Sequence, residues 1–362
     1  MSRLLLRSIP ALLLLCLAAP SARADHGTGT FSIVAYDSVT QELGVAVQSK
    51  YFSVGRMVPW AEAGVGAVAT QASVNASFGV QALAMLKEGK SASQVMAALA
   101  ASDSSWSGRQ VGIVDAEGHA ASWTGPKCND WAGGETGAGF ACQGNILAGP
   151  AVVANMAKAY RETRGELAVR LIAALEAAQA AGGDKRGMQS AALIVTRPSK
   201  THPEYRFRYV DLRVEDHKTP IAEMRRIWNI HAGFHGAGAH LDYADQYEKE
   251  GRKDLAELEK SRVRETLDDA LTRKETDAGL LNGLAWSCAT RDLFLPESVR
   301  AAERAAELEP KSTDILDTLA ECYFRAGQAA KAVEVGTRAV KLDPKSQYLK
   351  DQLARYQKGA AR

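Results

Sequence analysis

The chain lacks an excess of charge of either sign. Its 362 residues include 44 lysines and arginines and 42 aspartates and glutamates, so the formal net charge is +2. Proteins that hold nucleic acid through its phosphates usually carry a clear basic surplus. The composition therefore argues against a nucleic-acid partner.

Cysteine is scarce as well, with five residues in the whole chain. None of the cysteine spacings is that of a zinc site, so we expect neither a metal nor another cofactor. A disulfide between Cys128 and Cys142 is possible in an exported protein, and the sequence leaves that pairing open. Cys288 and Cys322 are expected to be small buried residues.

Long apolar runs are absent except near the start of the chain. Arg3 and Arg7 flank the first leucines, an almost wholly apolar stretch covers 11–19, and small residues lead up to Ala24. This pattern predicts a secretory signal peptide over residues 1–24 that is cleaved after Ala24 and is too short to span a membrane. We therefore expect a periplasmic or secreted protein without a membrane span in the mature chain.

Segments of strand-like and helix-like pattern follow in a definite order. Strands are expected over 30–35, 43–49, 64–71, 109–114, 119–123, 140–143, 191–196 and 205–214, and helices over 75–88, from 91, over 150–161, 166–181 and 221–231. Helix pairs thus alternate with groups of strands. This order predicts an α+β domain in which two sheets pack together and helices cover the outer faces, a four-layer αββα sandwich.

Several of these segments are similar to a bacterial family of unknown function, DUF1028. The similar segments are 30–35, 44–50, 58–60, 64–71, 109–115, 143–149, 182–190 and 210–214, so the resemblance covers about residues 30–231. The family in turn resembles the N-terminal nucleophile hydrolases, an αββα class that includes proteasome subunits. The resemblance implies a threonine-nucleophile amidase architecture whose substrate is not established.

Thr30 opens the first strand directly after Gly29. A threonine hydroxyl can act as a nucleophile once the peptide bond before it is cut, because the freed α-amine then takes the proton. In many members of the family the threonine follows the initiator methionine, whereas here residues 25–29 would remain after signal cleavage. If the Gly29–Thr30 bond is cleaved, we expect an enzyme. If the bond is retained, we expect a binding domain with the shape of a hydrolase.

Polar residues at other strand ends are candidate partners of Thr30. Lys50 ends the second strand, where an ammonium group favours a reactive threonine or stabilises an oxyanion, although it could equally be a solvated lysine. The candidate substrate or oxyanion contacts are Gln48, Ser49, Thr70, Asn75, Arg109, Gln143, Gly144, Asn145, Asp184 and Arg186. Helix caps, turns and structural ion pairs are the alternative interpretations of several of them.

The second half of the chain has a different pattern. Residues 232–277 are rich in mixed charge and predict a charged helical linker. Its glycine-rich start holds His235 and His240 and follows His231, but no carboxylate or cysteine joins these histidines at ligand spacing, so we predict a flexible segment and no metal.

Residues 278–358 contain a repeat. Ala305, Leu308 and Pro310 recur 34 residues later as Ala339, Leu342 and Pro344. This is the period of the tetratricopeptide repeat, which the segment resembles, and a terminal helix follows. The concave face of such repeats commonly holds peptides or partner proteins, although a spacer or a homodimer contact is an alternative.

Three hypotheses about function follow from the sequence. The first is an exported hydrolase of amide bonds in an unknown small-molecule or peptide substrate, with a protein-interaction repeat module. The second is a non-catalytic binding or scaffold protein of the cell envelope, and the third is an acyl or lactone hydrolase that uses the same nucleophile.

Overall fold

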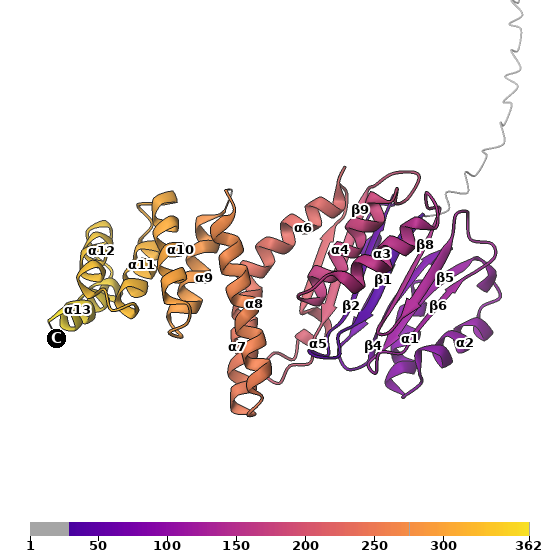
Figure 1. Cartoon of the computed structure of the whole chain (residues 1–362), viewed down its shortest axis with the longest axis horizontal. Coiled ribbons are helices and arrows are strands. Elements are labelled where there is room, and N and C mark those ends of the chain that lie inside the picture. The colour runs from indigo at the N-terminus through magenta and orange to yellow at the C-terminus, as the bar shows by residue number, and fades with distance from the viewer. Residues whose placement is uncertain (1–28, 275, 362) are drawn as a thin grey trace, which may run out of the picture.

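The computed structural model describes residues 29–274 and 276–361. The predicted signal peptide lies outside these residues. A part built from two sheets and their covering helices comes first, and an all-helical part follows and ends at the C-terminus, far from the sheets (Figure 1).

The first part contains two antiparallel sheets. The six-stranded sheet has the order β10 (Val210–Val214), β9 (Ser190–Thr196), β2 (Leu43–Ser49), β1 (Thr30–Tyr36), β8 (Phe140–Asn145) and β7 (Gly133–Gly137). The four-stranded sheet has the order β3 (Pro59–Glu62), β4 (Gly66–Ala72), β5 (Arg109–Asp115) and β6 (Ala120–Thr124). In the first sheet β1 is a central strand, paired with β2 on one side and β8 on the other.

Alternate residues of β1 belong to different layers, because successive side chains of a strand point to opposite faces. Phe31 and Ile33 pack with α3 (Ala151–Glu162) and α4 (Leu167–Ala180), whereas Val34 lies in the core between the sheets. The four-stranded sheet is covered on its outer face by two further helices, α1 (Ser77–Lys87) and α2 (Ala92–Ser102). The predicted four-layer αββα sandwich is confirmed (Figure 1).

Three local elements differ from the expected pattern. The segment expected as one strand over 205–214 forms the short helix α5 (Tyr205–Arg208) before β10 begins. Strand β3 was not predicted, and β7 lies in a stretch that reads as a glycine-rich loop. Both are short edge strands that pair with the next strand along the chain, β4 and β8 respectively. Neither has a regular apolar alternation, so hydrophobic periodicity does not reveal them.

The segment expected to be a flexible linker is helical. Helix α6 (Pro220–His231) continues through a π-helical turn, Ala232–Gly236, into α7 (Ala237–Lys249). The glycines are used for close packing: a Cβ at Gly233 would lie 2.6 Å from Cγ of Leu280. The prediction of a flexible segment was wrong because glycine serves close approach as well as chain flexibility.

Helices α7 and α8 (Lys253–Thr272) form a hairpin that is shared between the two parts. Tyr243 and Tyr247 are buried in the core under the six-stranded sheet, whereas Leu241 and Val263 are buried in the core of the helical part. The predicted charged segment is therefore mostly helical as far as Thr272, but it is packed on both sides and is not a solvated connector.

The C-terminal part is a short tetratricopeptide-like array. Its helices are α9 (Ala278–Ala289), α10 (Leu295–Leu308), α11 (Thr313–Arg325), α12 (Ala329–Leu342) and α13 (Gln347–Ala360). Consecutive helices pack against each other, and Ser312 and Ser346 cap equivalent helices through hydrogen bonds from the backbone N–H three residues on. Cys288 and Cys322 are buried and free, as expected. Within the described residues, no helix is both long and apolar enough to cross a bilayer.

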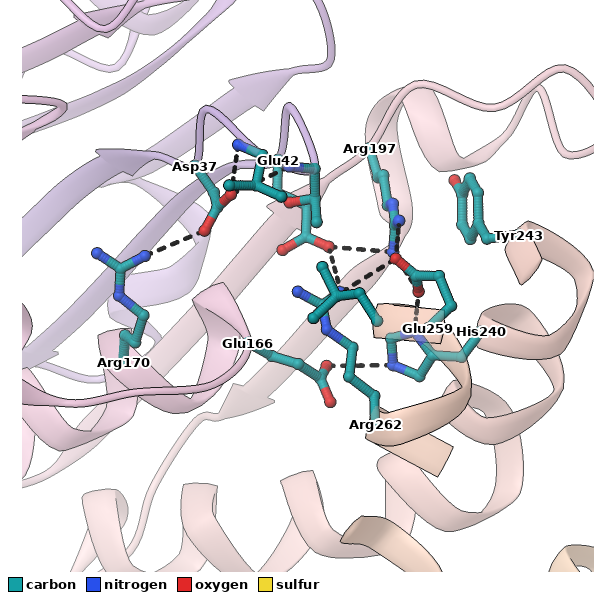
Figure 2. A network of polar contacts seen from close by, with 12 residues as sticks. Asp37, Glu42, Glu166, Arg170, Arg197, His240, Tyr243, Glu259 and Arg262 are labelled. Atoms are coloured by element: carbon teal, nitrogen blue, oxygen red, sulfur yellow. Dashed lines mark hydrogen bonds and ion pairs between the residues drawn. The ribbon is translucent and has the colours of Figure 1, made fainter. Parts of the chain in front are cut away.

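A buried network of charges joins the sheet domain to the α7–α8 hairpin (Figure 2). Arg197, which follows β9 and is fully buried, binds Glu259 of α8 at 2.6 Å and Glu42 at 3.2 Å, and its guanidinium lies 3.7 Å from the ring centroid of Tyr243. Such a pair is tolerated in the interior only when each charge has a partner.

His240 of α7 extends this network. Its Nδ1 lies 2.6 Å from Glu259, and its Nε2 lies 3.3 Å from Glu166. Arg262 lies 3.6 Å from Glu42 and 3.5 Å from Glu259. With His240 protonated, the carboxylates of Glu42, Glu259 and the partly buried Glu166 face three buried cations, so the network is formally neutral.

The protonation of His240 makes the stability of the protein depend on pH. Burial alone would lower the pKa of His240 from 6.5, but Glu166 and Glu259 raise it to about 9. The stabilisation is fully present below pH 6.5 and is lost as the pH rises through 9, and a shift of this size corresponds to roughly 3 kcal/mol. We expect the urea midpoint to fall between pH 7 and pH 10, with a smaller fall in His240→Gln. Equal pH dependence in the two proteins would contradict this assignment.

Candidate active site

Thr30 is the first residue of β1 and lies between the two sheets. It is opposite Ser49 of β2 and Asn145 of β8, and its side chain faces the other sheet, as that of Val34 does. Thr30 is only 1% exposed. The adjoining pocket has a volume of about 10 Å³, close to the space of one water molecule, and is bordered mainly by apolar side chains of the segment that follows β2, among them Val54 and Met57.

The peptide bond before Thr30 is held by its carbonyl group. Arg186 donates a hydrogen bond from Nη2 to the Gly29 oxygen at 2.8 Å, and the hydroxyl of Ser49 donates a second, short one. The hydroxyl of Thr30 donates to Oγ of Ser49 at 3.0 Å. The nucleophile candidate, the Ser49 hydroxyl and the Gly29 carbonyl oxygen therefore form a continuous hydrogen-bonded chain.

Asp184 fixes the arginine of this site. Its buried carboxylate accepts hydrogen bonds from Nε and Nη2 of Arg186, at 3.1 and 2.8 Å, and from the backbone N–H of Lys50 at 3.1 Å. A Cβ at position 29 would lie 2.7 Å from Oδ2 of Asp184 and 2.8 Å from Nη2 of Arg186. Only glycine fits before Thr30 while this ion pair holds the carbonyl.

Side-chain amides fill the space between the sheets behind Thr30. Gln71 accepts a hydrogen bond from Ser32 at 2.6 Å and donates to the Thr30 carbonyl at 3.3 Å and to Gln110 at 2.9 Å. Asn145 donates to the same Gln110 oxygen at 2.8 Å. Gln71 thus holds the carbonyl group of Thr30, and Gln110 connects Gln71 to Asn145.

Two of the predicted candidates, Gln143 and Gly144, also belong to this layer. Gln143 donates to the hydroxyl of Ser32 at 2.7 Å, and the Gly144 carbonyl accepts from Gln110 at 2.8 Å. Sequence reasoning missed Ser32 and Gln110. Their signal is a polar residue at an inward position of a strand that is otherwise apolar, which has to be hydrogen-bonded when buried.

Two predicted residues next to Ser49 point elsewhere. The side chain of Lys50 is exposed and donates to the Met188 carbonyl at 3.1 Å. Gln48 lies on the opposite face of β2 from Ser49, and its buried amide has no hydrogen-bond partner among the described residues. In this structure Lys50 joins the site through its backbone N–H.

Three further candidates have structural contacts with other residues than Thr30. The hydroxyl of Thr70 donates to the Asn75 carbonyl at 3.3 Å, and the Asn75 side chain accepts from Ser77 at the start of α1. Arg109 forms an ion pair with Asp103 at 2.6 Å. These contacts correspond to the alternative interpretations, a turn with a helix cap and a structural ion pair.

Cysteine and histidine provide no metal site in the described chain. Cys128 and Cys142 are both free, and no group of three His, Cys, Asp or Glu side chains is arranged to hold a metal ion among the described residues. His231 and His235 have ring centroids 5.5 Å apart, and burial lowers the pKa of His231 to about 4.

One family model matches the sheet domain of the chain. The model of a family described as "Family of unknown function (DUF1028)" matches residues 30–224, so its match begins at Thr30. The chain belongs to the DUF1028 family. The crystal structure of a DUF1028 protein from Silicibacter pomeroyi is 29% identical, with a TM-score of 0.52, and the match covers 56% of this chain and 89% of that one.

The C-terminal repeats of this DUF1028 protein also have structural neighbours. The first tetratricopeptide domain of human RPAP3 is 15% identical, with a TM-score of 0.25, over 34% of this chain and 92% of that chain. A structure described as the first tetratricopeptide repeat domain of Spaghetti (RPAP3) bound to an HSP90 peptide is 16% identical at the same TM-score, over 35% of this chain and 94% of that chain. No curated protein matches the chain.

Proposed function

We propose that this DUF1028 protein is a threonine-nucleophile hydrolase that becomes active when the bond between Gly29 and Thr30 is cleaved. The observation that carries the proposal is the chain of hydrogen bonds from the Thr30 hydroxyl through Ser49 to the Gly29 carbonyl oxygen. A carbonyl with two donors on its oxygen is polarised for attack, and those donors stabilise the charge that attack creates.

The protein's own groups are sufficient for this cleavage. The Thr30 oxygen attacks the Gly29 carbonyl carbon, its proton passes to Ser49, and Ser49 gives its own proton to the carbonyl oxygen. The C–N bond then breaks and the nitrogen takes a proton, which leaves Gly29 as an ester on the Thr30 oxygen. Water hydrolyses this ester, releasing the segment that ends at Gly29 and freeing both the hydroxyl and the α-amine of Thr30.

In the mature protein the groups that hold the Gly29 carbonyl take part in substrate binding. Once Gly29 has left, Arg186 and Ser49 bind the carbonyl oxygen of a substrate, and the Thr30 α-amine is the base that takes the hydroxyl proton. The apolar border of the pocket, including Val54 and Met57, favours an apolar group next to that carbonyl. Amide bonds are the proposed substrates, in the cell envelope or outside the cell, with the repeats holding a protein partner.

A second function is favoured by the form with Gly29 in place. The pocket of about 10 Å³ beside Thr30 then has no room for a substrate. A chain that retains Gly29 is accordingly a binding or scaffold protein of the cell envelope, in which the repeats supply the interaction surface.

A covalent probe separates these functions. A chain that begins at Thr30, obtained by removal of an initiator methionine, is treated with an alkyl β-lactone, and so is a chain that begins at Asp25 and carries Gly29→Val to disfavour cleavage. We expect a single acyl adduct on Thr30 in the first chain only, located by peptide mass spectrometry. Absence of the adduct in the first chain, or equal labelling of the two, would contradict the proposal.

A further inference from the structure

The small pocket beside Thr30 is separate from the groups that hold the Gly29 carbonyl. The described residues that line it include Thr30 and Ser49 but not Gly29, Asp184 or Arg186. Departure of Gly29 frees the space next to Arg186 and Ser49, where a substrate carbonyl binds. It takes no residue out of the pocket wall, so the pocket keeps its volume of about 10 Å³ in the mature protein.

The wall of the pocket belongs mainly to the segment that follows β2, and hydrogen bonds hold this segment in place. The backbone N–H of Val54 donates to Oγ of Ser190 at 3.1 Å. The carbonyl of Val58 accepts from the backbone N–H of Thr70 at 3.1 Å. Ser190 belongs to β9 and Thr70 to β4, so the segment is bound to both sheets.

Close packing fixes the same segment further. A Cβ at Gly55 would lie 2.8 Å from Cβ of Ala192, so the backbone there lies directly against β9. The side chains of Val54 and Val58 are buried in the core between the sheets. Because interiors are close-packed, this wall cannot move outward without losing hydrogen bonds and contacts, and the pocket does not widen for a larger group.

The direction of proton transfer places the two halves of a substrate. The α-amine of mature Thr30 takes the hydroxyl proton and gives it to the leaving nitrogen. The leaving group therefore lies on the side of the Thr30 backbone nitrogen. The acyl group then lies on the other side, toward which the Thr30 side chain faces, and this side holds the pocket formed by Val54, Met57 and Val74.

We propose, on the basis of the hydrolase function above, that the substrates are amides of short apolar acyl groups and that acetyl fits best. A space of about 10 Å³ takes roughly one group of the size of a water molecule, such as the methyl group of acetyl. Val54, Met57 and Val74 offer no polar partner, and the amide of Gln71 is engaged by Ser32 and Gln110, so a polar acyl group is disfavoured. Each further methylene has to displace the fixed wall.

Acylation of the chain that begins at Thr30 tests the proposal, with the p-nitrophenyl esters of acetate, butyrate and hexanoate as probes. The three esters share one leaving group, so the ratios of their kcat/KM values, corrected for spontaneous hydrolysis, report the fit of the acyl group. We expect the acetyl ester to react at least about tenfold faster than the hexanoyl ester, because single methylenes change such ratios by roughly tenfold or more. The acyl adduct should lie on Thr30 in peptide mass spectra.

Two variants widen the pocket. Val54→Ala and Met57→Ala are expected to raise the rate of the butyryl ester relative to that of the acetyl ester. Met57 is only half-buried, so its variant folds even where the buried Val54 does not tolerate truncation. Val80→Ala is the matched control, because Val80 is 58% exposed on α1 and does not line the pocket, and it should keep the ratio of the unaltered chain.

The outcomes separate the acyl specificity from the hydrolase function. Equal rates for the three esters with an adduct on Thr30, or a preference for hexanoyl, would overturn the specificity and leave the function standing. An unchanged ratio of butyryl to acetyl in both widened variants would overturn the assignment of the pocket in the same way. Absence of an adduct on Thr30 with every ester would overturn the hydrolase function and the acyl specificity together.

Discussion

The Thr30→Ala variant is expected to fold and to keep the bond between residues 29 and 30 intact whenever the unaltered protein is cleaved there. The substitution removes the attacking oxygen and one hydrogen bond to Ser49. A lost hydrogen bond of this kind costs about 1 kcal/mol, which is small beside the stability of a domain. The loss of cleavage, in contrast, is complete, because no other atom takes the place of the threonine oxygen.

Two related variants show whether the chemistry belongs to Thr30. Thr30→Ser retains a hydroxyl and should still be cleaved, and Thr28→Ala, an equal change two residues earlier, should be cleaved as the unaltered protein is. Intact mass measured over time for the four proteins provides the comparison. Cleavage of Thr30→Ala at the same bond would show that a separate protease makes the cut.

Arg197→Met is expected to give the largest loss of stability. The guanidinium of Arg197 is fully buried between Glu42 and Glu259, and methionine would leave both carboxylates in the interior with fewer positive partners. Breaking a buried ion pair in this way costs roughly 3–5 kcal/mol. Because the pair connects β9 to α8, the sheet domain and the α7–α8 hairpin should both be affected.

Urea unfolding followed by circular dichroism measures this loss. Arg338→Met is the control, because it is the same substitution at an exposed position of α12. The midpoint should fall markedly in Arg197→Met and hardly change in the control. Similar midpoints in the two variants would show that the network contributes little. Burial also raises the pKa of Glu42, which favours a neutral carboxyl there once its cation is gone.

Much of the fold follows from local sequence patterns. The apolar run of β1 and the helical spacing of Leu167, Leu171 and Leu175 in α4 reflect which side chains are buried, so strands, helices and layers could be predicted. The contacts between the sheet domain and the α7–α8 hairpin could not be predicted in this way. Their network joins Glu42 and Arg197 to α8, and sequence alone does not show which distant charges meet in a folded interior.

The candidate site was predictable in part for the same reason. Ser49, Asp184 and Arg186 were predicted as contacts, and they gather at Gly29 because β2 pairs with β1 and the loop before β9 reaches the same sheet end. Gln48 and Ser49 could not both face Thr30, because neighbouring strand residues point to opposite faces. The side chain of Lys50 donates its hydrogen bond to the Met188 carbonyl, and no local pattern specifies where Met188 lies.

The central claim of this account is that Thr30 becomes the first residue of the mature protein. N-terminal sequencing and intact mass of the protein recovered from an exporting cell, before and after incubation, test it most directly. The account predicts a chain that begins at Thr30. A chain that begins at Asp25 under every condition would contradict it, since the α-amine of Thr30 would then never be free.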